Sequence, residues 1–139
     1  MQKLYNYDTN IPKQEQVARF YGFLFQGGNK MAVLINTEEA LLRLGGNEQI
    51  FKTLLNKFTN NPYYEELCAH MENNDLAEAK NNAHTIKGTA GNLGLTALFE
   101  IATALDSALK QGDDAGPLFE EFQTIYEDTM AEIKSYISG

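Results

Sequence analysis

Residues 75–94, DLAEAKNNAHTIKGTAGNLG, place a histidine among side chains that suit phosphoryl chemistry. On a helical wheel, where successive residues are about 100° apart, His84 shares one face with Lys80 and Lys87. Because that face lies off the apolar stripe, His84 is predicted to be exposed, with an ammonium group one turn before it and another one turn after. A neutral imidazole is a nucleophile near neutral pH, and a lysine can contact phosphoryl oxygens as a point charge.

Two glycines, Gly88 and Gly91, continue the same face. A glycine inside a helix costs about 1 kcal/mol relative to alanine, so the stability of the helix does not explain them. A bare backbone does allow another surface to approach closely, which predicts that a partner protein docks here. The candidate site residues, called the His84 face from here on, are Lys80, Asn81, His84, Lys87, Gly88 and Gly91.

The helix that must position this face has a recognisable start and end. Asp75 and Glu78 have the spacing of a capping box, and Gly94 stands where a left-handed C-terminal cap is expected. Its other side is apolar at helical period, which predicts that it faces a core. The stripe consists of Leu76, Ala79, Ala83, Ile86, Ala90 and Leu93.

The segment AHTIKGTAGNLG, residues 83–94, resembles the signature of histidine-containing phosphotransfer (HPt) domains, of the type found in hybrid sensor kinases. His84 matches the phosphorylated histidine of that family, and Lys87 and Gly88 match the lysine and glycine that follow it. Leu93 and Gly94 match the closing Leu-Gly. A looser resemblance extends from about residue 35 to about residue 112.

The resemblance implies a phosphorelay carrier, and not an enzyme with its own ATP site. Nε2 of His84 would accept a phosphoryl group from an aspartate of a receiver domain and give it to another, with Lys87 contacting the phosphoryl oxygens. No cofactor is expected in this chain, because Mg²⁺ would be supplied by the receiver. The receiver would belong to a response regulator or a hybrid histidine kinase, and the chain could be a fragment of such a kinase.

Composition sets further limits on function. The chain of 139 residues has the size of one domain, and its formal charge of −8 argues against nucleic acid and anionic membranes as partners. Its longest apolar run, residues 31–35, is too short to span a bilayer, and MQKLYNYDTN lacks the apolar core of a secretory signal. Cys68 has no partner for a disulfide within the chain, which is typical of a reducing cytosol. A cytoplasmic monomer is the expectation.

The rest of the sequence predicts an all-α protein, an antiparallel up-down four-helix bundle with additional short N-terminal helices. Residues 35–139 would form the bundle and residues 1–34 an extension packed on it. In the extension, residues 17–26 favour a helix, and a hairpin pairing residues 20–25 with 31–35 is the alternative. Further helices are predicted at about 36–44, 47–61, 63–71, 95–111 and 117–137, with Pro62 either breaking or kinking the chain. Asn36 and Asn47 are expected to cap the first two of these helices, and Ile50 is expected to face inward on the second.

Three other functions compete with the relay. A helical adaptor could dock on receivers without transferring phosphate, and the phosphorylated domain of a chemotaxis kinase has a similar motif. A metal-binding bundle is the third, but a di-iron site needs Glu-x-x-His motifs and none occurs. The second histidine, His70, follows Glu66 by four residues, and no metal ligands are assigned.

Overall fold

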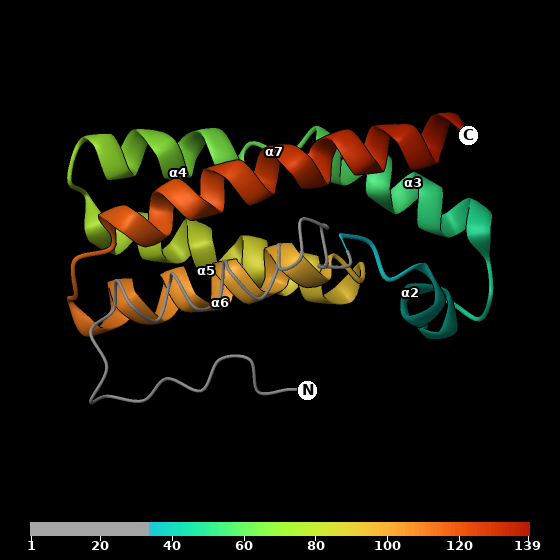
Figure 1. Cartoon of the computed structure of the whole chain (residues 1–139), viewed down its shortest axis with the longest axis horizontal. Coiled ribbons are helices and arrows are strands. Elements are labelled where there is room, and N and C mark those ends of the chain that lie inside the picture. The colour runs from blue at the N-terminus through green and yellow to red at the C-terminus, as the bar shows by residue number, and fades with distance from the viewer. Residues whose placement is uncertain (1–33) are drawn as a thin grey trace, which may run out of the picture.

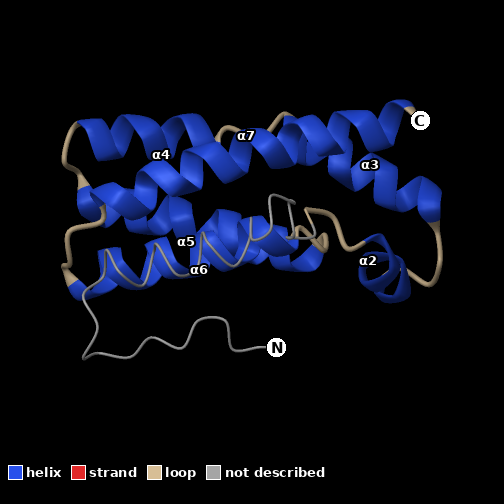
Figure 2. Cartoon of the chain, viewed as in Figure 1, coloured by secondary structure: helices blue, strands red, loops and turns tan. Residues whose placement is uncertain are grey.

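The computed structural model describes residues 34–139, which form six helices and no strand (Figures 1 and 2). The predictions of a helix at residues 17–26, of a hairpin across residues 27–29 and of an extension packed on the bundle fall outside the described residues, apart from Leu34, which packs against the core. The six helices are α2 (Thr37–Arg43), α3 (Glu48–Thr59), α4 (Tyr63–Glu72), α5 (Leu76–Asn92), α6 (Thr96–Gln111) and α7 (Gly116–Ser138).

The helices pack as an antiparallel up-down bundle, which confirms the predicted fold class. Helices α3 and α4 follow one another along one side and together make its first long element (Figure 1). Helices α5, α6 and α7 then run back and forth along the bundle, each packed against the one before it or against the first element. The short helix α2 lies at the end of the bundle where α3 begins.

Pro62 separates the two parts of the first element. Helix α3 ends at Thr59 and α4 begins at Tyr63, so the proline breaks the helix instead of kinking it. Its ring cannot donate a backbone hydrogen bond and clashes with the preceding turn. Helix α3 packs mainly against α7 and α4 mainly against α5, and Tyr64 at the start of α4 also stacks on Tyr126 of α7, with ring centroids 3.9 Å apart.

The predicted N-caps are present, but the capping box of Asp75 and Glu78 is only half formed, because the Asp75 N–H donates to His70 O. The side chains of Asn36, Asn47 and Asp75 each accept a hydrogen bond from a backbone N–H in the first turn of their helix, at 3.1, 3.1 and 3.5 Å. Gly94 adopts the left-handed conformation, with φ of 71°. A Cβ there would lie 2.7 Å from the carbonyl oxygen of Asn36, whose own N–H donates to Gly94 O. Gly94 therefore ties α2 to the end of α5.

Most of the predicted stripes form the core, and two residues do not. The fully buried side chains include Phe51, Leu55, Leu67, Ile86, Leu98, Ile101, Leu105, Phe122, Ile125 and Ile133. Ile50 and Leu76, which were expected to face inward, are 45% and 38% exposed. Both lie in the first turn of their helices, at opposite ends of the bundle.

Candidate functional site

His84 lies in the middle of α5 and its side chain is 65% exposed. Its Nδ1 atom is 3.3 Å from Oδ2 of Asp106, which lies 22 residues later on α6. The two nitrogens of an imidazole ring point in different directions, so an Nδ1 held against α6 leaves Nε2 directed away from this contact. The exposure predicted for His84 is confirmed, and its partner on α6 was not predicted.

Lys87 comes from the next turn of α5 and approaches the same atom. Its Nζ is 3.5 Å from Oδ2 of Asp106, so the ammonium group lies beside the His84 ring. A lysine pairing with a carboxylate of this protein was not expected from the sequence. The pairing holds Lys87 next to the imidazole instead of leaving it extended into solvent.

Asp106 is the residue that the sequence interpretation missed. Only 4% of its side chain is exposed, and its Oδ1 is buried with no hydrogen-bond partner among residues 34–139. A signal was present, because Asp106 is the one acidic residue among the buried positions of α6. Carboxylates are rarely buried without partners, since desolvating a charge costs several kcal/mol or more. An acid beside an apolar helix stripe was therefore a candidate for a functional contact.

The two glycines of the His84 face have different surroundings. A Cβ added to Gly88 would meet nothing within 4 Å, so the backbone there is open to another molecule. At Gly91 a Cβ would lie 3.1 Å from the Phe99 ring of α6. The second glycine is thus explained in part by packing inside this chain, which the sequence interpretation did not foresee.

A polar hollow of about 490 Å³ lies beside the His84 face, on its C-terminal side. Gly88 and Gly91 line it together with the exposed ring of Phe99. On its α2 side, Arg43 donates a hydrogen bond to Gly91 O and pairs with Glu39 at 3.2 Å. Another wall includes Glu100, where burial raises the pKa of the carboxyl group. Helix α2 thereby extends the surface that surrounds the histidine.

The remaining members of the His84 face precede the histidine by about one turn. Asn81 is exposed and Lys80 is half-buried, as expected for one continuous surface. The carbonyl oxygen of Asn81 accepts a hydrogen bond of 3.1 Å from the Thr85 hydroxyl. The structure therefore places all six predicted residues on one side of α5, and brings His84 and Lys87 together through Asp106.

His70 on α4 has a different environment. Its Nδ1 is 2.7 Å from Oδ1 of Asn82, a buried residue of α5. The Asn82 amide in turn donates to Oε1 of Glu66, at 3.1 Å. Since that amide oxygen accepts, Nδ1 of His70 carries the proton. This chain of hydrogen bonds joins α4 to α5, and it contains no lysine or arginine.

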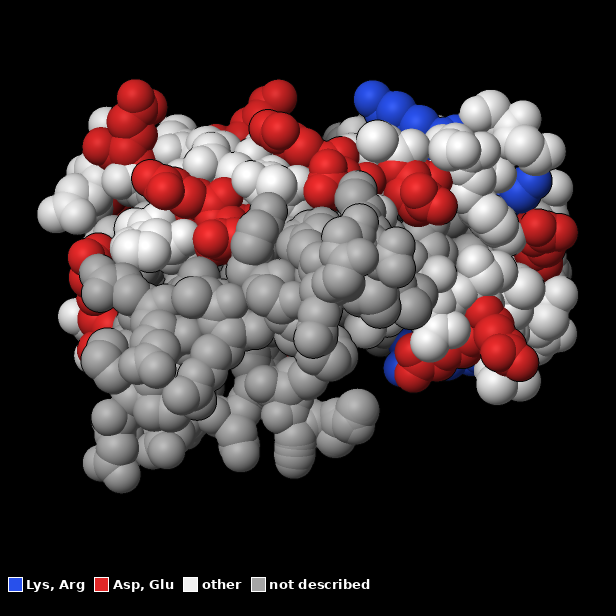
Figure 3. Space-filling model, viewed as in Figure 1, with Lys and Arg blue, Asp and Glu red and all other residues white. Residues whose placement is uncertain are grey.

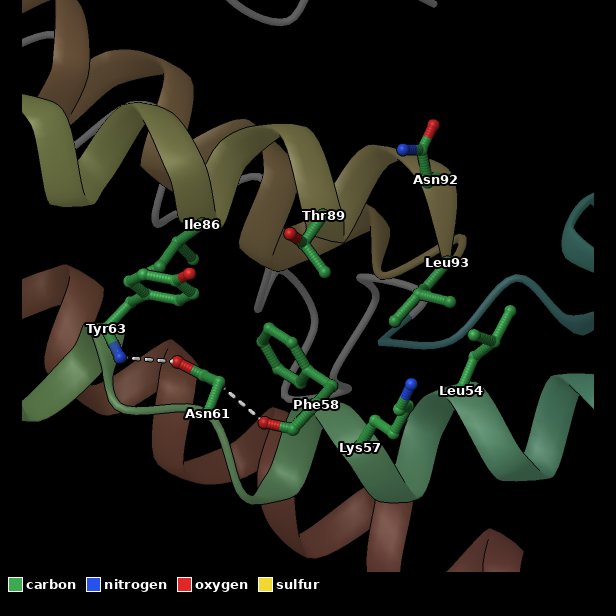
Figure 4. A pocket seen from close by; sticks show the side chains of 9 residues that line it. All are labelled: Leu54, Lys57, Phe58, Asn61, Tyr63, Ile86, Thr89, Asn92 and Leu93. Atoms are coloured by element: carbon green, nitrogen blue, oxygen red, sulfur yellow. Dashed lines mark hydrogen bonds between the residues drawn. The ribbon is translucent and has the colours of Figure 1, made fainter.

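An apolar cavity of about 330 Å³ lies between α3, the start of α4 and α5 (Figure 4). Ile86, Thr89 and Leu93 form its α5 wall, on the side of the helix away from His84. Across from them, Asn61 donates to Phe58 O and accepts from the Tyr63 N–H. Lys57 is the one cation that lines the cavity. The cavity is thus separate from the side chains around His84.

The charge of the surface agrees with the composition. Acidic side chains are spread over much of the face drawn in Figure 3, whereas basic ones gather toward the end where α3 lies. Within residues 34–139, no group of three or more His, Cys, Asp or Glu side chains could hold a metal ion. None of the helices described here combines the length and the apolar character needed to cross a membrane.

Comparison with known proteins gives one match. The family model for the Hpt domain matches residues 57–135, which is more than half of the chain and runs from α3 to α7. Both histidines lie within the matched range. Neither the curated proteins nor the solved structures include a significant match.

Proposed function

Because the chain belongs to the Hpt domain family, we propose that it accepts and donates a phosphoryl group on His84. Hpt domains are histidine phosphotransfer carriers of two-component signalling, they interact with receiver domains, and they are not kinases with an ATP site of their own. The observation that carries the assignment to His84 is its exposed ring next to Lys87, above the open backbone of Gly88. The other histidine in the matched range is held against a buried amide.

The proposed step needs little from the chain beyond position. The lone pair of Nε2 attacks the phosphorus of a receiver's aspartyl phosphate. The N–P bond forms as the P–O bond to the aspartate breaks, and the receiver's carboxylate leaves with the electron pair. Phosphoryl transfer depends mostly on positioning and on neutralising the oxygens, which is the role proposed for Lys87. Mg²⁺ would be supplied by the receiver, and Lys80 would assist from the preceding turn.

The same face is proposed to dock the receiver. Gly88 leaves room for the loops that surround the receiver's aspartate, and the adjacent hollow presents the exposed Phe99 ring for an apolar contact. Asn81 offers a hydrogen-bonding side chain on the opposite side of the histidine. We propose that one receiver at a time binds a monomeric, cytoplasmic carrier, the receiver being part of a response regulator or of a hybrid histidine kinase.

Transfer from a labelled, phosphorylated receiver domain tests this function. Wild-type chain should acquire a label that acid removes and alkali does not, and His84→Gln should acquire none. His70→Gln is the matched control and should be labelled like the wild type. Label on His84→Gln would show that a residue other than His84 is phosphorylated. If no receiver labels the wild type but several bind it, the chain is an adaptor and the proposal is wrong.

A further inference from the structure

The cavity between α3, the start of α4 and α5 has the features of a ligand site, and the proposed phosphotransfer does not use it. Its volume of about 330 Å³ is at the lower end of the range for small-molecule sites, which is roughly 300 to 1,000 Å³. We propose that it binds a small apolar molecule that carries one carboxylate group, with the carboxylate paired to Lys57. This inference goes beyond the proposed function and does not depend on it.

Apolar side chains form both walls of the cavity. Leu54 and Phe58 project from α3, and Ile86 and Leu93 project from α5 (Figure 4). Helix α3 packs mainly against α7, and α5 mainly against α6 and α4, so each wall is held by other neighbours. An apolar ligand between the walls would be removed from water, which favours binding roughly in proportion to the apolar area that is covered.

Most polar groups of the cavity already have partners within the chain. The Asn61 amide nitrogen donates to Phe58 O and, at 3.3 Å, to the Tyr126 hydroxyl. Its oxygen accepts a hydrogen bond of 2.7 Å from the Tyr63 N–H. The Thr89 hydroxyl donates to a backbone carbonyl of its own helix, at 3.1 Å. These side chains therefore need no polar partner from a ligand, and its apolar part can lie against them.

Lys57 is the exception, and it selects the charge of the ligand. Within residues 34–139, no ion pair or side-chain hydrogen bond involves its ammonium group. Figure 4 shows its side chain directed from α3 toward α5, whereas Asn92 points away from the cavity. No Asp or Glu lines the cavity, although the chain contains 19 of them. An anion bound here would thus pair with the ammonium without competition from an acidic side chain in the lining.

The single ammonium also limits the kind of anion. A carboxylate carries one negative charge, whereas a phosphate group carries more at neutral pH and is usually bound by several donors. A monovalent carboxylate therefore matches Lys57 better than a phosphate does. None of the six residues of the His84 face lines the cavity, so the ligand would leave the proposed docking surface uncovered.

The test is a titration of the full chain with three ligands of similar size and different charge: phenylpropanoate, phenylpropanamide and phenylpropylamine. Methyl resonances of Leu54, Ile86 and Leu93 in ¹³C-edited spectra report occupation of the cavity. Phenylpropanoate should shift these resonances and bind most tightly. The neutral amide should bind about fivefold more weakly, the size of effect of one exposed ion pair, and the amine more weakly still.

Two lysine variants separate the charge at the cavity from the charge of the whole chain. Lys57→Met keeps an unbranched side chain and removes the ammonium, so phenylpropanoate should bind about fivefold more weakly and the amide equally well. Lys110→Met is the matched control, an exposed lysine in the last turn of α6 that does not line the cavity. It should leave the affinity for each ligand unchanged. A circular dichroism spectrum checks that both variants are folded.

Three results would overturn the proposal. The first is equal affinity of the wild type for phenylpropanoate and its amide, and the second is an equal loss in Lys57→Met and Lys110→Met. The third is the absence of shifts at the three methyl-bearing residues with millimolar ligand. Shifts of the same resonances that depend on the protein concentration would show that a second copy of the chain fills the cavity, which would also reject it.

Discussion

The two histidines lie on different sides of α5, and both have Nδ1 bonded to a polar side chain of a neighbouring helix. His70 bonds to Asn82, whose amide donates in turn to Glu66, so the partner of His70 is itself paired. His84 bonds to a carboxylate that also pairs with Lys87 and whose second oxygen has no hydrogen-bond partner within residues 34–139. The hydrogen bonds of His70 form a network between α4 and α5. The ring of His84 instead has a carboxylate, an ammonium group and exposed surface around it.

The comparison shows that the residue type does not identify the site. Both rings present Nε2 once Nδ1 is engaged, so the difference lies in what surrounds them. A cation, an open backbone at Gly88 and a buried carboxylate lie near His84, whereas amide and carboxylate groups that satisfy each other lie near His70. Unsatisfied polar groups are uncommon in folded proteins and often mark a functional site. In the function proposed here, the His84 face is the reactive side of α5, and the His70 side contributes to stability.

Removing the centre of the His70 network should have the largest effect on folding. Asn82→Ala deletes both hydrogen bonds of a buried residue, and we expect a loss of about 2 kcal/mol in the free energy of unfolding. Urea denaturation measures it. Phosphoryl acceptance by the folded variant should remain at the wild-type rate, since the side-chain hydrogen bonds of Asn82 lead to His70 and Glu66 and not to the His84 face. A variant that is stable but inactive would erase the distinction between the two sides.

The reactive side should respond in the opposite way. Lys87→Ala removes the cation beside the ring, and we expect about tenfold slower acceptance, the size of effect of one charge-assisted hydrogen bond. Some stability should be lost as well, because the Asp106 carboxylate is only 4% exposed and loses its cation. Lys80→Ala is the control with the same loss of charge and a smaller effect on rate. Equal effects of both substitutions would show that only the overall charge of the face matters.

Substitutions of the two glycines of the His84 face should also differ in their effect on stability. Gly88→Ala should raise the free energy of unfolding by up to about 1 kcal/mol, because the position is helical and its Cβ meets nothing. Gly91→Ala should gain less or lose stability, since the Phe99 ring must move. Thermal unfolding compares them. Gly88→Leu, equally tolerated by the fold, should weaken receiver binding measured by titration, and unchanged binding would place the docking surface elsewhere.

Helical periodicity and capping residues predicted most of the fold, and they predicted the residues that α5 contributes to the candidate site. The caps at Asn36, Asn47 and Asp75 and the turn at Gly94 depend on neighbouring residues, and the sequence shows them directly. Pro62 left two possibilities, because a break and a kink differ only in how the following helix packs. The prediction that Ile50 and Leu76 face inward was wrong, since helical period does not reveal where a bundle ends.

The missing half of the site depends on contacts between distant segments. The position of His84 and Lys87 on one exposed face follows from the period of α5 alone. Asp106 comes from α6, and Arg43 from α2, so their approach to α5 depends on the register between packed helices. The glycine at position 91 could not be explained from its own helix either, because a Cβ there would meet the Phe99 ring of α6. A wheel describes one helix, and this site is assembled from three.

The most direct test is a ¹⁵N-edited spectrum of the phosphorylated wild-type chain with labelled histidine. It reports which of the two rings carries the phosphoryl group and through which nitrogen. For the proposed function, we expect the phosphoryl group on Nε2 of His84 and unchanged shifts for His70. A phosphoryl group on His70, or on Nδ1 of His84, would contradict it.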